Sequence, residues 1–521
     1  MIQLDKKHNP MKNKILINEI STKHPMASMT DILSISEKLF NETCKINKQK
    51  NNINWLTFMT KSFLIKRVRY EAIQSTQWKV DHEENIYPDW ICELDQQYVN
   101  LYDHIKEEVN LKDFGAVGDG MTDDTEAIRK AIGRGKVIVR IPEGIYVTKG
   151  IKLPSWTVLL GEGKGKTTLK LHDQSPKSEW LITNKNHVRG NRNIAIKGMT
   201  LDWNVERLGN EEKTAAGNNR SSCLTFANVT YGWMLDLEAI NPGLHCFDVS
   251  SSVYTYLGDG TRSRGGSKYI WLDNLNGYGF GDDGITTHHS EHIFISNSHM
   301  CDPSGRSHKK GFSNSNGIEI DDGSHNVWLL NNSTARCFGG VEIKAHHNAS
   351  AATNVHIAGH LSVNDNRAYN FRHIGHHKDI DPASKTAYHI SATNICAIAP
   401  VFTELYRAST PRGLVVSGYN HVIINGFTLI GDPFYDYQEN PMIAVQYRAR
   451  NVLLNQVSLR DFTSAGPAIK VYGGPHRADD ITIKNLTCDH YFTKTVSVGA
   501  NVENAAIEHV VIQPKKETSI T

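Results

Sequence analysis

The segments HVIINGFTLIG (residues 421–431) and NVLLNQVSLR (residues 451–460) share one pattern: a polar residue, alternating aliphatic residues, then Asn or Gly. The pattern returns six more times between residues 193 and 488, with most starts roughly 25 to 40 residues apart. An alternation with a period of two residues predicts β-strands, and Asn and Gly favour the corners between them. Strands this short cannot bury their own apolar face, so the units must stack as the coils of a solenoid.

Two other all-β architectures also contain many short strands, the sandwich and the propeller. Both use regular hairpin turns. This sequence has one hydrophobic pair in each irregular repeat and lacks regular hairpin turns. We therefore favour the solenoid.

The segment NLKDFGAVGDGMTDDTEAI (residues 110–128) precedes the repeats. Gly118, Asp119 and Gly120 predict a tight turn, and the following residues predict a short helix. The apolar residues between Ala127 and Ile132 are expected to cover the end of the solenoid.

Together with IPEGIYVTKGIKLPSWTVLLGEGKGKTTLKL (residues 141–171), this segment resembles the opening of pectate-lyase-superfamily proteins, including many bacteriophage tailspike polysaccharide depolymerases. The resemblance covers residues 110 to about 515. It implies an all-β, right-handed, single-stranded parallel β-helix and, for the phage members, a homotrimer. Many tailspikes carry a further C-terminal trimerisation domain, and none is recognisable after the last repeat.

Three regions are expected. Residues 1–108 form an N-terminal attachment and linker region, residues 109–515 form the β-helix, and residues 516–521 form a C-terminal tail. Residues 28–46 and 55–68 are helix-like, and residues 1–80 hold 14 Lys and Arg against 6 Asp and Glu. Since the basic residues alternate with apolar ones, we expect a helical segment that docks onto the phage tail or another tail protein.

The composition excludes several classes of protein. The 57 Lys and Arg nearly balance the 55 Asp and Glu, which argues against a nucleic-acid-coating chain. No apolar run approaches the ~18 residues of a membrane span, so no membrane insertion is expected. The N-terminus has no apolar secretory core, which agrees with phage release by lysis. The eight cysteines form no CxxC pairs, and neither a structural metal nor a cofactor is expected.

Acidic residues recur at successive coil positions. They lie in GDDGITTHHSE (residues 281–291), GIEIDDG (residues 317–323) and GVEIKAHH (residues 340–347). Residues one coil apart lie about 4.8 Å from each other, so these side chains should gather on one wall. The set is Asp282, Asp283, Glu319, Asp321, Asp322, Glu342 and Lys344. If Ile318 and Ile320 fill the core, Glu319 and Asp321 should face solvent.

Stacked carboxylates repel each other, so at least one should have a raised pKa and remain protonated. A protonated and an ionised carboxyl supply the acid and base of glycoside hydrolysis, with retention at about 5 Å separation and inversion at roughly 6.5–9.5 Å. The GDD and EIK segments resemble elements of polygalacturonase-like glycoside hydrolases, although the NTD and GHG elements are missing. Structural turn residues and a bound calcium are the alternative interpretations of the acids.

Histidines are concentrated in the same region, with 14 of the 25 between His288 and His389. His288 or His289 could serve as a general base, which is the chemistry of a polysaccharide lyase. With the acids Asp282, Asp283, Glu319, Asp321 and Asp322, these two histidines complete the predicted catalytic set. The predicted substrate-binding residues are Glu342, Lys344, His346, Trp203, Arg372, His376, Tyr447 and Arg448.

The preferred interpretation is a phage tailspike that binds and cleaves a bacterial surface polysaccharide, such as capsule or O-antigen, while attached to the virion. Because carboxylates dominate the cluster, hydrolysis is favoured over β-elimination. A non-catalytic receptor-binding spike and a polysaccharide epimerase are the remaining alternatives.

Overall fold

The computed structural model describes residues 2–21, 34, 38, 78–81, 85–252, 254, 265–346, 349–373 and 387–514. Apart from residues 34 and 38, the helices expected over residues 28–46 and 55–68 lie outside this part of the chain. The tail at residues 516–521 also lies outside it.

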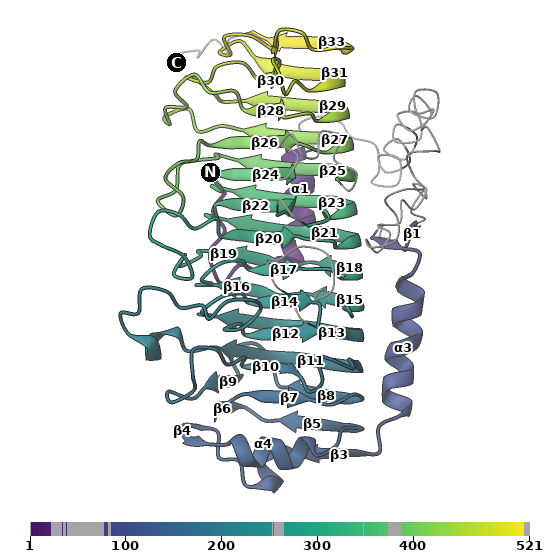
Figure 1. Cartoon of the computed structure of the whole chain (residues 1–521), viewed down its shortest axis with the longest axis vertical. Coiled ribbons are helices and arrows are strands. Elements are labelled where there is room, and N and C mark those ends of the chain that lie inside the picture. Colours follow the sequence, from purple (N-terminus) through teal and green to yellow (C-terminus); the bar gives the residue numbers. More distant parts are fainter. Residues whose placement is uncertain are drawn as a thin grey trace, which may run out of the picture.

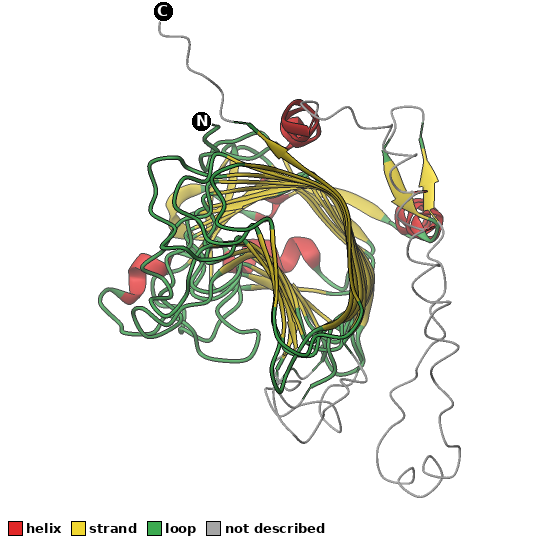
Figure 2. Cartoon of the chain, turned by 90° about the horizontal axis from the view of Figure 1, so that it is seen from above, coloured by secondary structure: helices red, strands yellow, loops and turns green. Residues whose placement is uncertain are grey.

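The chain winds into a right-handed parallel β-helix, as the sequence predicts (Figure 1). Each coil contributes one short strand to a 12-stranded parallel sheet and one longer, curved strand to the opposite wall (Figure 2). The short strands are β7 (Ile151–Leu153), β10 (Ile182–Asn184), β12 (Leu224–Ala227), β14 (Phe247–Ser250), β17 (Ile285–Thr287), β20 (Asn316–Ile320), β22 (Gly339–Ala345), β24 (Arg367–His373), β26 (Arg412–Ser417), β28 (Ile443–Gln446), β30 (Ile469–Val471) and β32 (Val496–Val498).

The repeats recognised in the sequence are strands of the longer wall. This wall comprises β11 (Asn191–Asp202), β13 (Val229–Ile240), β15 (Lys268–Asp273), β16 (Asn276–Tyr278), β18 (Glu291–Ser296), β19 (His299–Cys301), β21 (His325–Ala335), β23 (Thr353–Val363), β25 (Tyr388–Ile398), β27 (Asn420–Ile430), β29 (Arg450–Arg460), β31 (Asp479–Asp489) and β33 (Ala505–Gln513). The first coils use β3 (Glu107–Asn110), β4 (Asp119–Asp123), β5 (Val137–Ile141), β6 (Gly144–Thr148), β8 (Thr157–Gly161) and β9 (Thr167–Leu171).

The core lies between the two walls and is filled by stacked aliphatic side chains. Ile293, Val327 and Val355 are register partners on successive coils, and all are fully buried. Each coil adds only two or three such residues at each wall, so the core is continuous only because the coils are in register.

Asn and Gly turn the long strands. Asn326, Asn354 and Asn451 adopt φ values of 55°, 53° and 50° at the starts of strands, and Asn331 and Gly426 adopt 52° and 78° within them. Positive φ is least costly for Gly and Asn. The corner role predicted for these residues is therefore confirmed.

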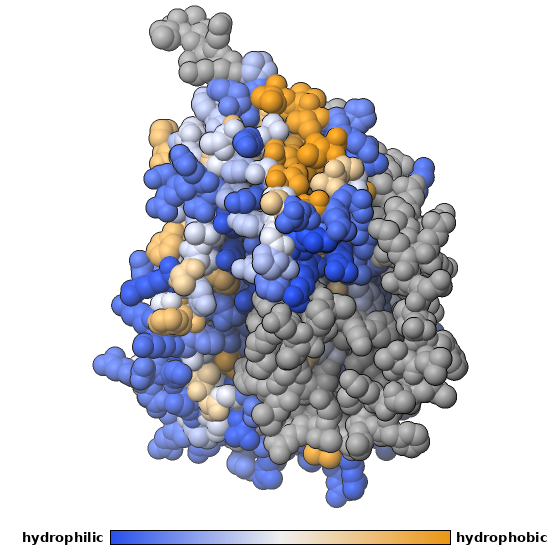
Figure 3. Space-filling view, turned by 45° about the horizontal axis from the view of Figure 1, so that its top comes forward, coloured by the Kyte–Doolittle hydropathy of each residue, from blue (hydrophilic) through white to orange (hydrophobic). Residues whose placement is uncertain are grey.

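One end of the column is covered by α4 (Thr125–Ile132), whose Ala127, Ile128, Ala131 and Ile132 are buried as predicted (Figure 1). At the other end β33 exposes apolar side chains, including Ile507, Val511 and Ile512, on the surface seen in Figure 3.

Two N-terminal helices lie along the outside of the long wall. In α1 (Asn13–Ser21), Ile17 and Ile20 pack into a buried cluster with residues of β19, β21, β23 and β25. In α3 (Ile91–Asp103), Leu94 and Leu101 pack against aromatic residues such as Trp233. The hairpin of β1 (Trp78–Val80) and β2 (Ile86–Pro88) precedes α3, and η1 (Pro10–Lys12), η3 (Leu111–Phe114) and η4 (Val205–Leu208) are single 3-10 turns. None of the described helices has the length and apolar character needed to cross a bilayer.

Candidate active site

The acidic residues gather on the outer face of the short-strand sheet. Asp248, Thr286, Glu319 and Glu342 are register partners on β14, β17, β20 and β22. Because side chains alternate along each strand, their neighbours, such as Ile318, point into the core. Sequence positions almost a hundred residues apart thus form one column on a single wall.

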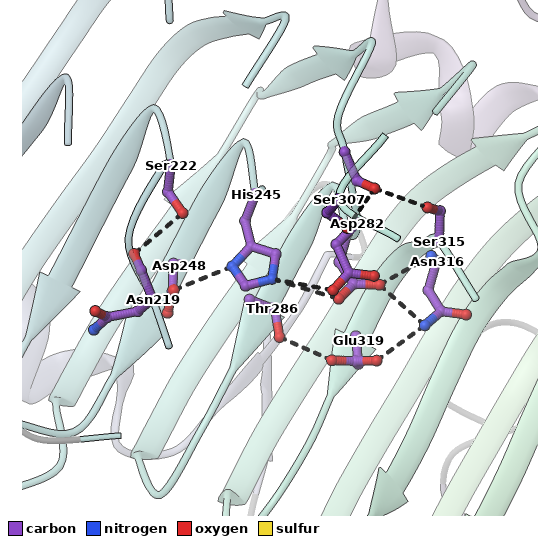
Figure 4. A network of polar contacts seen from close by, with 12 residues as sticks. Asn219, Ser222, His245, Asp248, Asp282, Thr286, Ser307, Ser315, Asn316 and Glu319 are labelled. Carbon is purple, nitrogen blue, oxygen red and sulfur yellow. Dashed lines mark hydrogen bonds and ion pairs between the residues drawn. The ribbon is translucent and has the colours of Figure 1, made fainter. Parts of the chain in front are cut away.

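His245 lies at the centre of the first group of acids, immediately before β14 (Figure 4). Its Nδ1 is 3.2 Å from Asp248 Oδ2, and its Nε2 is 3.9 Å from Asp282 Oδ2 and 3.7 Å from Asp283 Oδ2. His308, from the loop before β20, places Nε2 2.8 Å from Asp282 Oδ1. The GDD segment is therefore held between two imidazoles from other coils.

The two adjacent aspartates of this segment have opposite pKa shifts. Burial and the nearby charges of Asp282 and Glu319 raise the pKa of Asp283 well above its ordinary value. Burial opposes ionisation of Asp282 too, but His308 and His245 outweigh it and hold the pKa of Asp282 at about 2. Asp282 is therefore ionised at neutral pH, whereas the environment of Asp283 favours its protonated form, as expected for stacked acids.

The position of the Asp283 proton follows from its hydrogen bonds. Asn316 donates from its backbone N and its Nδ2 to Asp283 Oδ1, at 2.9 and 3.0 Å. With Oδ1 accepting both, the acidic hydrogen belongs on Oδ2, the oxygen beside His245.

Lys344 neutralises the second group of acids. Its Nζ is 2.7 Å from Glu319 Oε1 and 3.7 Å from Asp321 Oδ2. Burial opposes the lysine charge, but Asp321 and Glu319 raise the pKa of Lys344 well above its ordinary value. Thr286 Oγ1 and Asn316 Nδ2 also donate to Glu319, which fixes this carboxylate on the sheet.

His288 does not have the protonation state of a general base. Its Nε2 is 3.6 Å from Asp321 Oδ2, and its Nδ1 is 4.0 Å from Asp248 Oδ1. Although burial lowers it, these carboxylates raise the pKa of His288 to about 9. The imidazole is therefore charged at neutral pH, and the predicted role of His288 as a base is wrong. His289 instead turns away from the strand at φ 46°, with its ring against Gly323.

The expectation that Glu319 and Asp321 face solvent is also wrong. Both point away from the core, but only 2% and 1% of their surfaces are exposed. Residues of the flanking loops, including His308 and His346, lie over the same face. These two histidines are the more accessible members of the site, with 33% and 28% of their side chains exposed.

The predicted binding residues divide into two groups. Glu342 pairs with Arg372, His346 Nδ1 is 2.9 Å from Asp322 Oδ2, and Lys344 contacts Glu319, so these four predicted binding residues adjoin the acid cluster. Trp203 does not, because its indole is fully buried in the core with its Nε1 bonded to Glu179 O. The proposal that Trp203 stacks on a sugar is thus contradicted.

The remaining binding residues lie farther along the sheet or outside the described part. Tyr447 and Arg448 follow β28, and Gln446 is three rungs, or about 14 Å, beyond Lys344 in the same column. His376 lies outside the described residues.

Four residues of the site escaped the sequence interpretation: His245, Asp248, His308 and Asn316. The register pairs Phe247 with Ile285 and Asp248 with Thr286, so HCFDV (residues 245–249) aligns with DGITT (residues 283–287). The apolar residue that the two strands share at this rung, Phe247 and Ile285, was the available signal. No such signal existed for His308, which reaches the site from a loop.

Among the residues that the structure describes, three sets have ligand-type atoms within 4.8 Å of one another. They are His245 with Asp282 and Asp283, His288 with Glu319 and Asp321, and Asp321 with Asp322 and His346. In the second set the Lys344 ammonium already neutralises Glu319 and Asp321, which disfavours a cation there. In the first, a protonated Asp283 would be a weak ligand.

A parallel β-helix with acids on its short-strand sheet is the architecture of pectate-lyase-like proteins. A family model for rhamnogalacturonase A/epimerase, pectate lyase-like, matches residues 108–342. The chain is 50% identical over 446 residues to the phage-related protein YobO of Bacillus subtilis (strain 168), covering 86% of this chain and 55% of that protein. It is 42% identical over 418 residues to the pre-neck appendage protein of Bacillus phage phi29, covering 79% and 48%.

A solved structure agrees with these relationships. The crystal structure of the N-terminal fragment of phi29 gene product 12 matches with a TM-score of 0.71 and 40% identity, covering 81% of this chain and 68% of that fragment. The chain belongs to the phage appendage proteins of the pectate-lyase-like superfamily. This confirms the family and the virion localisation predicted from the sequence. The chain spans about half the length of the curated relatives it matches.

Proposed function

We propose that this protein is a phage depolymerase that hydrolyses a bacterial surface polysaccharide at Asp282 and Asp283. The observation that carries the proposal is the different surroundings of these adjacent carboxyls, since His308 contacts Asp282 and Asn316 donates to Asp283, and their pKa values shift in opposite directions. Hydrolysis of a glycosidic bond needs one protonated and one ionised carboxyl.

Each carboxyl has a separate task in the proposed reaction. Asp283 donates the proton on Oδ2 to the glycosidic oxygen as the bond to the leaving sugar breaks. Asp282, which His308 keeps ionised, supplies the carboxylate on the opposite side of the sugar carbon. An oxygen of Asp282 and one of Asp283 lie within 4.8 Å, which favours the close spacing of a retaining enzyme. Water then releases the sugar from Asp282, with Asp283 acting as the base.

Hydrolysis accounts for the site better than β-elimination. A lyase needs a neutral base, and His288 is charged at neutral pH. Lys344 is likewise held in its protonated form by Glu319 and Asp321.

The proposal also covers how the protein attaches to the phage and how its copies assemble. We assign residues 1–108 to attachment on the phage tail, through surfaces that α1 and α3 leave exposed, and we expect three copies to assemble around one axis. Three copies would present three sites to a repetitive polymer. Light scattering of the purified chain tests the trimer, and a monomer would contradict it.

The test is incubation with a panel of bacterial capsular and cell-wall polysaccharides, followed by mass analysis of the product ends. Asp283→Asn should lower the rate by roughly 10²–10⁴-fold, the contribution of a general acid. Asp119→Asn, at an exposed aspartate near α4, is the matched control and should leave the rate unchanged.

Three results would count against the proposal. Products that absorb near 235 nm would identify β-elimination. Binding without shortening of any polymer would identify a receptor-binding spike. Altered sugar composition in chains of unchanged length would identify an epimerase.

A further inference from the structure

Four histidines of the site alternate with three of its aspartates in one continuous chain. The order is His308, Asp282, His245, Asp248, His288, Asp321 and His346. The chain begins at the edge of the sheet where the short strands start, crosses β14, and ends at the opposite edge, where β20 and β22 stop. We call these seven residues the imidazole–carboxylate chain, and Figure 4 shows its part from Asp282 to Asp248.

Six contacts connect consecutive members of this chain. The contact of His308 with Asp282 and that of His245 with Asp248 are hydrogen bonds of 2.8 and 3.2 Å. The other four contacts measure 3.9, 4.0, 3.6 and 3.7 Å between nitrogen and oxygen. They exceed the ~3.2 Å limit of ordinary hydrogen bonds by less than about 1 Å. Hydrogen bonds of unliganded active sites are often this long and tighten when a substrate binds.

The interior members use different atoms for their two neighbours. Asp282 and Asp248 each contact two imidazoles, one with each carboxyl oxygen. His245 and His288 each contact two carboxyl groups, one with each ring nitrogen. An imidazole can accept a hydrogen at one nitrogen and release one from the other, and a carboxyl group can do the same with its two oxygens. Hydrogens can therefore move along the chain without any residue changing its place.

The two ends of the chain reach solvent, whereas its interior is buried. His308 and His346 are partly exposed, and the five residues between them are not. The ring of Tyr254 packs on that of His288, with 3.9 Å between the ring centroids. Neither His288 Nδ1 nor Asp248 Oδ1, which face each other, has another hydrogen-bond partner among the described residues. Water thus has access to the interior of the chain mainly through its ends.

Asp283 adjoins this chain at His245. Its Oδ2 is 3.7 Å from His245 Nε2, and only 2% of the residue is exposed. A polymer bound over this face would separate Asp283 further from water. Because the ends of the chain lie at opposite edges of the sheet, it gives Asp283 two routes to solvent.

We propose that the imidazole–carboxylate chain is a proton relay, through which Asp283 exchanges its acidic hydrogen with solvent at His308 and His346. The inference rests on the proposed function and adds how the acid regains its proton while polymer covers the site. A proton from water binds the outer nitrogen of an end histidine, and each member passes one hydrogen to the next. The hydrogen of His245 Nε2 then moves to Asp283 Oδ2. One proton enters for each proton that Asp283 has lost, so the charge is balanced.

The experiment follows the ring hydrogens of His288 and needs no substrate. The full chain, with its histidines labelled with ¹⁵N, is studied by NMR at pH 7, and saturation transfer from water measures the exchange of both hydrogens. Both nitrogens carry one because His288 is charged at neutral pH. Without a relay these buried hydrogens exchange only when the sheet opens, as slowly as the backbone amides of β17 and β20. With the relay they should exchange at least about tenfold faster than those amides.

Variants at the two ends of the chain test the route. His308→Gln and His346→Gln each introduce an amide, which does not take up and release protons as an imidazole does. The double variant should slow the exchange of both ring hydrogens at least about tenfold. His346→Gln alone should slow the hydrogen on Nε2, which faces Asp321, more than the hydrogen on Nδ1. His325→Gln is the matched control and should change neither rate, because His325 has a similar exposure and contacts Glu291 on the opposite wall.

Failure of the relay and failure of the proposed function give different results. The relay is overturned if the ring hydrogens of His288 exchange as slowly as the neighbouring amides, or if the double variant exchanges them as fast as its parent. If the double variant has lost its native circular dichroism, His346→Gln decides, and equal rates at its two nitrogens overturn the relay. Fast exchange that needs both end histidines, in a protein that cleaves no polymer, would keep the relay and remove only the hydrolase assignment.

Discussion

Replacement of Lys344 by Met tests the electrostatic balance of the acid cluster. Lys344 is 94% buried at its side chain and lies 2.7 Å from Glu319. Met keeps much of the apolar length of lysine but leaves Glu319 and Asp321 buried beside each other without their cation. Breaking a buried ion pair by removing one partner costs about 3–5 kcal/mol. At pH 7 we expect the midpoint of thermal unfolding, monitored by circular dichroism at one scan rate, to be clearly lower in the variant than in the native protein.

The pH dependence of this loss is the sharper test. In the native protein burial opposes ionisation of Asp321, but Lys344 and His288 together hold its pKa well below the ordinary value of 3.8. This contribution to stability is present above the unfolded pKa and is lost as pH falls through the folded pKa. Without Lys344 only His288 and His346 oppose burial, so the folded pKa of Asp321 is higher and the stability that its ionised form contributes above the unfolded pKa is smaller. The difference in unfolding midpoint between the native protein and the Lys344→Met variant should therefore be largest near pH 7 and should shrink toward pH 4.

A second substitution supplies the control for this reasoning. Glu319→Gln in the Lys344→Met background removes one uncompensated charge and should recover part of the lost stability, as a double-mutant cycle would measure. The electrostatic account would be refuted if Lys344→Met lost the same stability at pH 4 as at pH 7. It would also be refuted if the double variant were less stable than Lys344→Met.

Three further predictions concern other parts of the molecule. Ile17→Ala should destabilise the docked α1 by about 2–5 kcal/mol, whereas Ile15→Ala, at a side chain 59% exposed, should be nearly neutral; equal shifts in the unfolding midpoint would contradict the packing of α1. Asp321→Asn should lower the pKa of His288 from about 9, which a proton NMR titration of the ring would measure; an unchanged value would mean that another group holds its charge. Newly released reducing ends should keep the configuration of the cleaved bond in NMR spectra recorded during hydrolysis, and inversion would reject the assignment of Asp282 as nucleophile.

The fold could be predicted because its determinants are local. Val422 and Ile424 alternate with outward-facing residues in one long strand, and Asn451 begins the next with positive φ. The short-strand sheet was harder to recognise, because β14 and β17 have only four and three residues. Strands of this length carry too few alternations to stand out from a turn.

The site could be predicted only in part because its chemistry comes from contacts between coils. Asp282 and Asp283 are adjacent, chemically identical residues, and nothing in the GDDG sequence distinguishes them. Their difference arises because His308 approaches Asp282 from a loop, whereas Asn316 donates to one oxygen of Asp283 and leaves the other for the proton. His288 is converted from a base into a cation for the same reason, since Asp321 from the next coil faces it. The residue types that bear the chemistry can thus be read from single segments, but their protonation depends on the register that brings the segments together.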